Sequence, residues 1–299
     1  MRLGEFVRFS RTPIATLLVG LGIGAGVAWP KSKVTTGMAG VRGCGLYYEV
    51  VGEGALVVLI HGGQLDRRMW DDQFPLFAQH FKVVRYDVRG YGRSEAARSG
   101  YSDEEDLGDL LRFLGIERAH IVGLSLGGRI AVDFALSQPS RVASLVLAGP
   151  GLGGFGWSSA DEEQFGRLIA AARDDGPEAV TNLWLRDPLM APAMDQVSLR
   201  ERLRQLCGEN AHAWLNNPLL RRRLDPPAIG RLAEIHVPTL LIVGSRDAPS
   251  IQQIVGKLEA GVRGARKVVI PGAGHMVNME KPDIFNRTVL GFLQKEQRN

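Results

Sequence analysis

The chain alternates short apolar runs with helical stretches along most of its length, and this alternation strongly limits the folds open to it. Runs rich in apolar and β-branched residues stand at 46–51, 55–60, 82–86, 119–122, 142–148, 239–243 and 267–270. Helical stretches are expected at 102–114, 126–138 and 282–294. Strands that alternate with helices predict an α/β fold, in which a mostly parallel central sheet is flanked by helices on both faces.

Local signals refine three of these elements. Residues 46–51 and 55–60 are expected to form an opening pair of strands, joined by the turn Gly52-Glu53-Gly54. The helix over 102–114 is expected to begin with a serine cap at Ser102, because Glu105 follows three residues on. The helix over 282–294 carries proline in its first turn, where the missing backbone donor is not needed.

The alternation stops between about 149 and 235. A glycine-rich linker opens this stretch, and helix-like runs follow at about 162–173, 178–186 and 197–208. An all-helical insertion after a core strand predicts a cap over the mouth of the site. The expected domains are therefore a core over 34–150 and 235–299, with a helical cap over 151–234.

Residues 1–33 are interpreted as a signal peptide or a membrane anchor. Three arginines precede an uncharged stretch over 13–30, and Lys31 and Lys33 follow it. Some 16–18 helical residues span about 24–27 Å, which is short for a bilayer core of about 30 Å. Export to the periplasm or the outside, or membrane association through 13–30, is favoured over a cytoplasmic location, and cleavage and retention both stay open.

The net charge of +4, with a pI near 9.2, does not indicate nucleic-acid binding. Residues 1–33 hold five basic residues and one acidic residue, so they carry the whole excess and the rest of the chain is neutral. Arg221-Arg222-Arg223 is interpreted as a solvated helix face. No charged cluster in the cap indicates a handle for a carboxylate or phosphate.

The two cysteines, Cys44 and Cys207, are expected to be unpaired, partly buried thiols. The chain has no Cys-x-x-Cys motif and no cluster of cysteine and histidine with metal-ligand spacing. The sequence therefore predicts neither a metal site nor a cofactor.

Residues 121–128 place Ser125 between a strand and a helix, with glycine two residues away on either side. Such a turn exposes a nucleophilic serine, and a serine needs a nearby base that an acid orients. In open α/β sheets these groups lie beyond the carboxyl ends of the strands. Of the six histidines only His61 and His275 follow strand ends, and the glycine-rich loop around His275 favours it as the base.

The same geometry selects two acids, Asp87 and Asp247. With Asp247 the chain order is Ser, Asp, His, the order that this arrangement of strand, nucleophile turn and helix uses. Asp87 stands in a turn whose polar groups are expected to hold neighbouring loops together, and His61 is expected to shape its own turn. Asp247 is therefore the expected acid.

Five segments in this order resemble the α/β-hydrolase family over about residues 40–299. They are 61–63 (HGG), 87–94 (DVRGYGRS), 123–128 (GLSLGG), 244–247 (GSRD) and 274–282 (GHMVNMEKP). The chain is most similar to capped serine esterases and 3-oxoadipate enol-lactonase-like hydrolases. The resemblance implies Ser125 as nucleophile, Asp247 as acid and His275 as base, with an oxyanion hole at the backbone N–H groups of Gly63 and Leu126. Gln64 stands where many relatives have glycine.

The expected function is a serine hydrolase that cleaves a carboxylic ester or lactone with a small, largely apolar acyl group. A C–C bond hydrolase, a lyase or a perhydrolase with the same triad is the alternative, and a non-catalytic binding protein is less favoured. Four tryptophans are candidate substrate-binding residues, although most of them are expected simply to pack the cap against the core. They are Trp70, Trp157, Trp184 and Trp214.

Overall fold

The structure, a computed structural model, describes residues 33–216 and 220–298. Apart from Lys33, the expected N-terminal signal or anchor segment lies outside this range, and so does the proposed membrane contact at 13–30. Within the described ranges, no helix combines the length and the apolar character that a membrane crossing requires.

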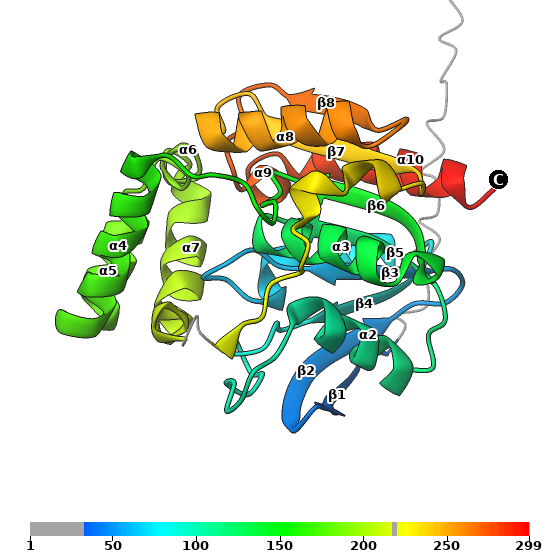
Figure 1. Cartoon of the computed structure of the whole chain (residues 1–299), viewed down its shortest axis with the longest axis horizontal. Coiled ribbons are helices and arrows are strands. Elements are labelled where there is room, and N and C mark those ends of the chain that lie inside the picture. Colours follow the sequence, from blue (N-terminus) through cyan, green and yellow to red (C-terminus); the bar gives the residue numbers. More distant parts are fainter. Residues whose placement is uncertain (1–32, 217–219, 299) are drawn as a thin grey trace, which may run out of the picture. The chain divides into compact units, whose positions relative to one another are not determined.

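Eight strands of the described chain form one central sheet (Figure 1). The strand order across the sheet is β1-β2-β4-β3-β5-β6-β7-β8. Pairs β1–β2 and β2–β4 are antiparallel, and the other neighbours are parallel, which confirms the mostly parallel sheet. The strands are β1 (Thr35–Val41), β2 (Cys44–Val51), β3 (Leu56–Ile60), β4 (Lys82–Tyr86), β5 (Ala119–Leu124), β6 (Val142–Ala148), β7 (Thr239–Gly244) and β8 (Arg266–Ile270).

The opening strands are not partners, which corrects the expected pairing of 46–51 with 55–60. Strand β4 lies between β2 and β3 and pairs with both. The backbone at Gly52 has φ of +80° and passes so close to the chain before β4 that a Cβ there would lie 2.2 Å from the Phe81 carbonyl oxygen. The turn therefore leads the chain past β4 instead of folding it back as a hairpin.

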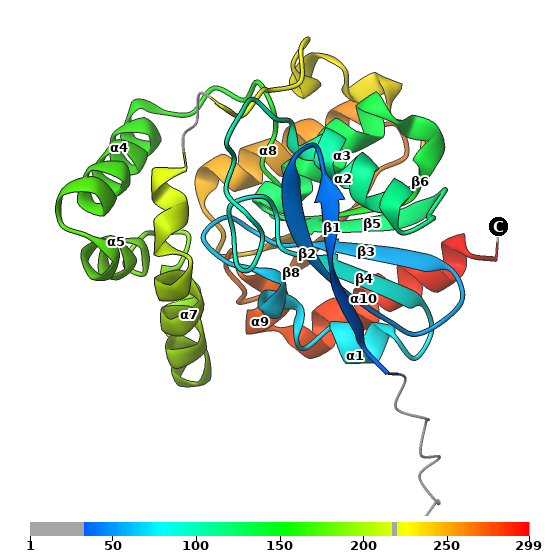
Figure 2. The same ribbon diagram turned by 90° about the horizontal axis from the view of Figure 1, so that it is seen from below.

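Helices cover both faces of the sheet, as expected (Figures 1 and 2). One face carries α2 (Asp103–Phe113), α3 (Leu126–Ser137) and α8 (Pro249–Gly261), and the other carries α1 (Phe74–Phe77), α9 (Val277–Glu280) and α10 (Pro282–Glu296). Alternate strand residues serve the two faces, because successive side chains of a strand point to opposite sides. Val57 and Leu59 pack in the cluster that contains α10, whereas Val58 and Ile60 pack against α2 and α3.

The two helix starts predicted from sequence have different outcomes. Pro282 occupies the first turn of α10, as predicted. Ser102 is the N-cap residue of α2, as predicted. Among the described residues its side chain makes no capping hydrogen bond, so the predicted contact is wrong. Four acidic residues in the first turn of α2 complement the positive end of the helix dipole instead.

The cap helices are α4 (Ser159–Asp174), α5 (Pro177–Trp184), α6 (Ala191–Met194) and α7 (Val197–Glu209). Short 3-10 helices lie at Arg67–Trp70, Pro139–Arg141, Ala211–Leu215, Ala228–Gly230 and Leu232–Glu234. Arg221–Arg223 are not helical, which corrects their interpretation as a helix face. Instead Arg221 forms an isolated parallel bridge with Tyr101 in the core.

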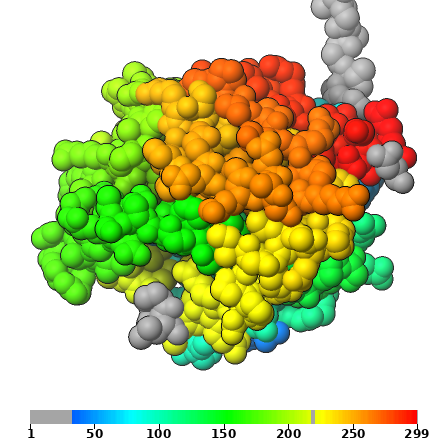
Figure 3. All heavy atoms as spheres, turned by 45° about the horizontal axis from the view of Figure 1, so that its top comes forward, coloured from blue at the N-terminus to red at the C-terminus, as the bar shows by residue number. Residues whose placement is uncertain are grey.

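The cap is fastened to the core by polar contacts at several points. Arg202 of α7 donates to Asp72 Oδ2 at 2.6 Å. The buried Asn210 donates to Asp66 Oδ2 at 2.9 Å and accepts from the Gly92 backbone N–H at 2.7 Å. In the space-filling view the green surface of the cap adjoins the orange surface around α8 (Figure 3). Arg246, after β7, and Asp195, after α6, form an ion pair at 2.8 Å.

Candidate active site

Ser125 occupies a strained turn between β5 and α3. Its backbone has φ of 53° and ψ of −112°, a conformation that side-chain-bearing residues rarely adopt. The Ser125 N–H donates to the Ala148 carbonyl at 3.0 Å, and its carbonyl accepts from the Arg129 N–H at 3.0 Å and the Gly151 N–H at 2.9 Å. These bonds to β6, α3 and the loop after β6 hold the turn, which leaves the serine side chain half-buried at the edge of the sheet.

The two glycines that flank Ser125 are required by close backbone packing. A Cβ at Gly123 would lie 2.2 Å from the Gly127 carbonyl oxygen, and a Cβ at Gly127 would lie 2.1 Å from the Ile60 carbonyl oxygen. Either contact is far inside van der Waals distance. The glycines therefore let α3 start directly against β3 and β5, and this close start makes the turn sharp.

Asp247 and His275 come together from the loops after β7 and β8. His275 Nδ1 lies 3.0 Å from Asp247 Oδ1 and 3.1 Å from Oδ2, and both side chains are buried. Because an ionised carboxylate can only accept, Nδ1 carries the proton and Nε2 is left to accept one. Asp247 Oδ1 also accepts from the Ala248 N–H at 2.8 Å, which fixes the carboxylate.

Gly149, which sequence reasoning missed, lies directly beside this pair. It follows β6 with φ of +44°, and a Cβ there would lie 3.0 Å from Asp247 Oδ2 and 3.1 Å from His275 Nδ1. A side chain at this position would therefore crowd both groups. The only signal in the sequence is a glycine at the carboxyl end of a strand, which is too common to be specific.

His61 and Asp87 hold the neighbouring loops, as expected from sequence. His61 Nε2 accepts from the Val88 N–H at 2.9 Å, so Nδ1 carries the proton and donates to the Gly62 carbonyl at 2.7 Å. Burial lowers the pKa of His61, which keeps the ring neutral. Asp87 accepts from the backbone N–H of Arg67 at 2.9 Å and of Arg93 at 2.8 Å. Both ring nitrogens of His61 are therefore occupied.

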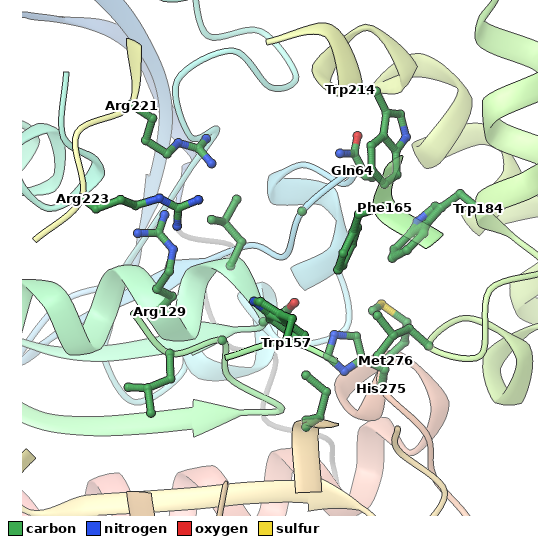
Figure 4. A pocket seen from close by; sticks show the side chains of 17 residues that line it. Gln64, Arg129, Trp157, Phe165, Trp184, Trp214, Arg221, Arg223, His275 and Met276 are labelled. Carbon is green, nitrogen blue, oxygen red and sulfur yellow. The ribbon is translucent and has the colours of Figure 1, made fainter. Parts of the chain in front are cut away.

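Ser125 and His275 line one cavity of about 350 Å³ (Figure 4). Gly63 and Leu126 line it beside the serine. From the cap come Trp157, Trp184 and Trp214, together with Phe165, which the sequence did not single out. The structure thus brings together Ser125, His275, Gly63, Leu126 and three of the four tryptophans, with Asp247 directly behind His275.

The comparisons with known proteins agree with this geometry. The model of the "Alpha/beta hydrolase family" matches residues 57–288. A 2-hydroxy-6-oxononadienedioate/2-hydroxy-6-oxononatrienedioate hydrolase of Pseudomonas putida is 33% identical over 264 residues, which are 83% of this chain and 91% of that protein. The chain belongs to the α/β-hydrolase family.

Two solved structures show the same fold. An enol-lactonase from Burkholderia xenovorans has a TM-score of 0.73 and 27% identity, covering 86% of this chain and all of that one. A thermophilic esterase from Thermogutta terrifontis, with malate bound, also has a TM-score of 0.73 and 27% identity, over 89% of this chain and 99% of that one. The fold class and the enzyme class expected from sequence are confirmed.

Trp70 does not line the cavity of this α/β hydrolase, which corrects its assignment as a substrate-binding residue. Its side chain is fully buried, and its ring centroid lies 6.0 Å from that of Phe285 on α10. Trp70 is the last residue of the 3-10 helix Arg67–Trp70, and its indole packs in the core on the face of the sheet that carries α10. The position after a candidate oxyanion loop was a poor guide to the direction of the side chain.

The charge environment of His275 includes a carboxylate that sequence reasoning overlooked. Burial acts to lower the pKa of His275, but the charge and hydrogen bond of Asp247, followed by the charges of Glu280 and Asp187, outweigh it and raise that pKa. Glu280 is itself buried and accepts from the Gly274 N–H at 2.8 Å. It therefore holds the loop that carries His275. Burial raises the pKa of Glu280 itself, and in its ionised form it adds negative charge beside His275.

Gln64 is a further cavity residue of this hydrolase. Its backbone φ is 60°, a left-handed value that glycine adopts more easily. Its side-chain oxygen is buried and has no hydrogen-bond partner among the described residues. A glutamine at this position therefore places an amide in the cavity.

Three arginines, Arg129, Arg221 and Arg223, also line the cavity. The sequence had indicated no charged cluster in the cap as a handle for a carboxylate or phosphate, but Arg221 and Arg223 fall within the expected cap range 151–234. Arg221 and Arg223 line the cavity, although Arg223 is also exposed to solvent, whereas Arg222 between them lies outside the cavity and pairs with Glu105 at 3.2 Å. The sequence shows a run of three arginines but does not show which of them turn inward.

The two cysteines are free thiols in the structure, and both are buried where partly buried thiols were expected. Burial raises the pKa of the Cys207 thiol to about 12, so it is not a thiolate at neutral pH. In the part of the chain that the structure describes, no group of three histidine, cysteine, aspartate or glutamate side chains is placed to bind a metal ion.

Proposed function

We propose that this α/β hydrolase cleaves a carboxylic ester or lactone, with Ser125 as nucleophile, His275 as general base and Asp247 as the orienting acid. One observation carries the proposal. Ser125 stands on a strained turn in the same cavity as His275, and the other ring nitrogen of His275 is bound to Asp247. A serine, a base and an acid in this relation form a nucleophilic triad.

The mechanism follows from the positions of these groups. His275 Nε2 takes the proton of Ser125 Oγ as Oγ attacks the carbonyl carbon, and the backbone N–H groups of Gly63 and Leu126 stabilise the resulting oxyanion. One such donor is worth about 3–4 kcal/mol in enzymes of this type. His275 then protonates the leaving alcohol, and a water that His275 deprotonates cleaves the acyl-enzyme.

The cap aromatics support a substrate with an apolar portion. Trp184 and Trp214 meet edge to face with ring centroids 5.4 Å apart, and Trp157 and Phe165 meet in the same way at 5.8 Å. Aromatic rings bury large apolar areas in one rigid arrangement. A cavity of about 350 Å³ is at the small end of ligand sites, which favours a small acyl group.

A C–C bond hydrolase is the second candidate. The Pseudomonas putida relative is named for an oxo-dienedioate substrate, which contains no ester or lactone, and this chain is 33% identical to it. The same serine could attack the ketone carbonyl of such a compound, because fold and triad do not determine the bond that is cleaved. A panel of p-nitrophenyl esters, lactones and vinylogous diketones separates the two activities.

The proposed nucleophile is tested by fluorophosphonate labelling and by Ser125→Ala. We expect the wild type to form a serine adduct at Ser125, and the variant to fold normally and lose several orders of magnitude in kcat/KM. Turnover close to that of the wild type in the variant would remove Ser125 from the mechanism. Failure of folded wild type to react with the probe would instead favour a binding protein on this fold.

We also propose that residues 1–33 export the protein or anchor it to a membrane. The support is the order of three arginines, an uncharged stretch over 13–30 and two lysines. The mass of the mature protein tests cleavage, and fractionation of cells tests membrane association. An intact protein found only in the cytoplasmic fraction would contradict both export and membrane anchoring.

A further inference from the structure

One wall of the cavity is formed by three guanidinium groups from two distant parts of the chain. Arg129 lies on α3, and its backbone N–H closes the first turn of that helix on the Ser125 carbonyl. Arg221 and Arg223 lie on the extended segment that leads from the cap back to the core. In Figure 4 the three side chains lie on one side of the cavity with their nitrogen-bearing ends close together; Phe165, Trp184 and Trp214 of the cap lie on the other side, and Trp157 lies between.

Arg129 is held rigidly in this wall by two carboxylates. It is buried, and its two Nη groups donate to Asp133 Oδ2 at 3.0 Å and Asp103 Oδ2 at 2.5 Å. These two carboxylates fix the guanidinium from behind. Among the described residues that line the cavity there is no aspartate or glutamate, so the cavity meets the arginines and not their counter-charges.

Arg221 is also held in place, with donors to spare. Its Nε donates to the Tyr101 hydroxyl at 3.0 Å and lies 3.3 Å from Asp103 Oδ2. Its backbone is tied to the core where the Tyr101 N–H donates to the Leu220 carbonyl at 2.8 Å. An arginine has five N–H donors, and these contacts use only the Nε donor.

Arg223 is the member of the wall without a direct partner. Within the described ranges its guanidinium makes no ion pair or side-chain hydrogen bond, whereas Asp103 and Asp133 are already engaged by Arg129. Burial and the positive charges of Arg129 and Arg221 lower the pKa of Arg223, and the more weakly acting charges of Asp103 and Asp133 offset this only in part. Glu104 lies nearby, but burial raises the pKa of its carboxyl, and it does not line the cavity.

We propose that Arg129, Arg221 and Arg223 form a subsite for a carboxylate carried by the substrate, opposite the cap aromatics. Planar guanidinium groups match a carboxylate in shape and can bind it through paired N–H donors. Ser125 and the three arginines line the same cavity of about 350 Å³, so a short substrate can reach both the arginines and the nucleophile. The substrate class is thus a short ester or lactone with a second, ionised carboxyl group.

The identity of the cleaved bond rests on the proposed function, but occupation of the subsite does not. The experiment therefore has a kinetic arm and a binding arm. The kinetic arm compares kcat/KM for monomethyl glutarate, which carries one carboxylate, with that for neutral dimethyl glutarate. The binding arm measures glutarate binding by calorimetry with wild-type protein, so it needs no turnover.

Arg223→Gln is the test variant, because Arg223 is exposed enough to be replaced without loss of folding. Arg222→Gln is its matched control. It removes the same charge from the neighbouring residue, whose side chain lies outside the cavity. We expect the wild type to prefer the monoester, and Arg223→Gln to reduce that preference and the glutarate affinity by at least about tenfold. Arg222→Gln is expected to leave both unchanged.

The two proposals fail in different ways. Hydrolysis of both esters with no preference for the anion, or equal glutarate affinity in Arg223→Gln and wild type, overturns the subsite and leaves the serine hydrolase in place. Glutarate binding that depends on Arg223, without hydrolysis of either ester, supports the subsite and contradicts ester cleavage. An equal loss in Arg222→Gln would show a general surface-charge effect and would also overturn the subsite.

Discussion

At the scale of single residues, the site depends on side chains that act through His275. Asp247 fixes the protonated nitrogen, and Glu280 holds the Gly274 N–H and adds a second negative charge. Both carboxylates oppose the effect of burial and raise the pKa of His275. Since the base works only in its neutral form, a raised pKa moves the onset of activity to higher pH.

Glu280→Gln tests this electrostatic contribution. The amide oxygen can still accept from the Gly274 N–H, but the negative charge is gone, so the pKa of His275 falls. We expect the acidic limb of the kcat/KM profile against pH to move to lower pH, because His275 then stays neutral further into acid. Asp283→Asn, which removes an exposed charge at the start of α10, is the control and should leave the limb in place. If the acidic limb of the profile does not move in Glu280→Gln, then Glu280 only holds the loop and does not affect the pKa of His275.

Gln64→Gly tests whether Gln64 reduces stability for the sake of the cavity. Glycine adopts a φ of 60° without strain, and the change also removes a buried amide oxygen that has no partner among the described residues. We expect the free energy of unfolding to rise by about 1 kcal/mol, measured by urea denaturation. A loss of stability would show that the glutamine packs more favourably than its backbone conformation indicates.

At the scale of elements, the packing of α3 against β3 and β5 creates the nucleophile turn. Gly127→Ala would place a methyl group 2.1 Å from the Ile60 carbonyl oxygen, and neither backbone can yield without moving α3. We expect a loss of about 3 kcal/mol or more in stability, together with loss of Ser125 labelling.

Gly166→Ala in α4 is the matched control for this change. Gly166 is exposed, and nothing lies within 4 Å of the position that its Cβ would take. The same substitution there should raise stability by about 0.5–1 kcal/mol, because alanine favours a helix more than glycine does. Equal effects at the two positions would contradict the role of close packing at the turn.

At the scale of the whole molecule, the cap is held by the contacts of α7 and the residues after it. Asn210→Ala removes one donor to Asp66, which keeps its hydrogen bonds to Arg68, and it removes the acceptor for the Gly92 N–H. We expect a loss of about 1–3 kcal/mol, faster amide hydrogen exchange in α7 and a higher KM. Arg246→Ala breaks only an exposed pair with Asp195 and should change stability by less than about 1 kcal/mol.

The sequence predicts those parts of the site that depend on local backbone geometry. Ser125, Asp247 and His275 each follow a strand, so the parallel sheet alone brings them to one edge. The arginine wall could not be predicted in this way. Arg129 and Arg221 meet only because the chain that leaves the cap returns along Tyr101, a contact between residues far apart in sequence. The predictions for Trp70 and for the neighbours of β4 were wrong for the same reason, because both depend on long-range packing.

The cap is inserted between β6 and β7, and this position has a consequence for the order of folding. Ser125 and Gly63 precede the insertion, whereas Asp247 and His275 follow it, so the pairing of β6 with β7 joins the two halves of the proposed triad. A ribosome-bound chain that ends within the cap already contains the nucleophile but has neither the acid nor the base. Recovery of activity during refolding therefore requires the pairing of β6 with β7 and cannot precede it.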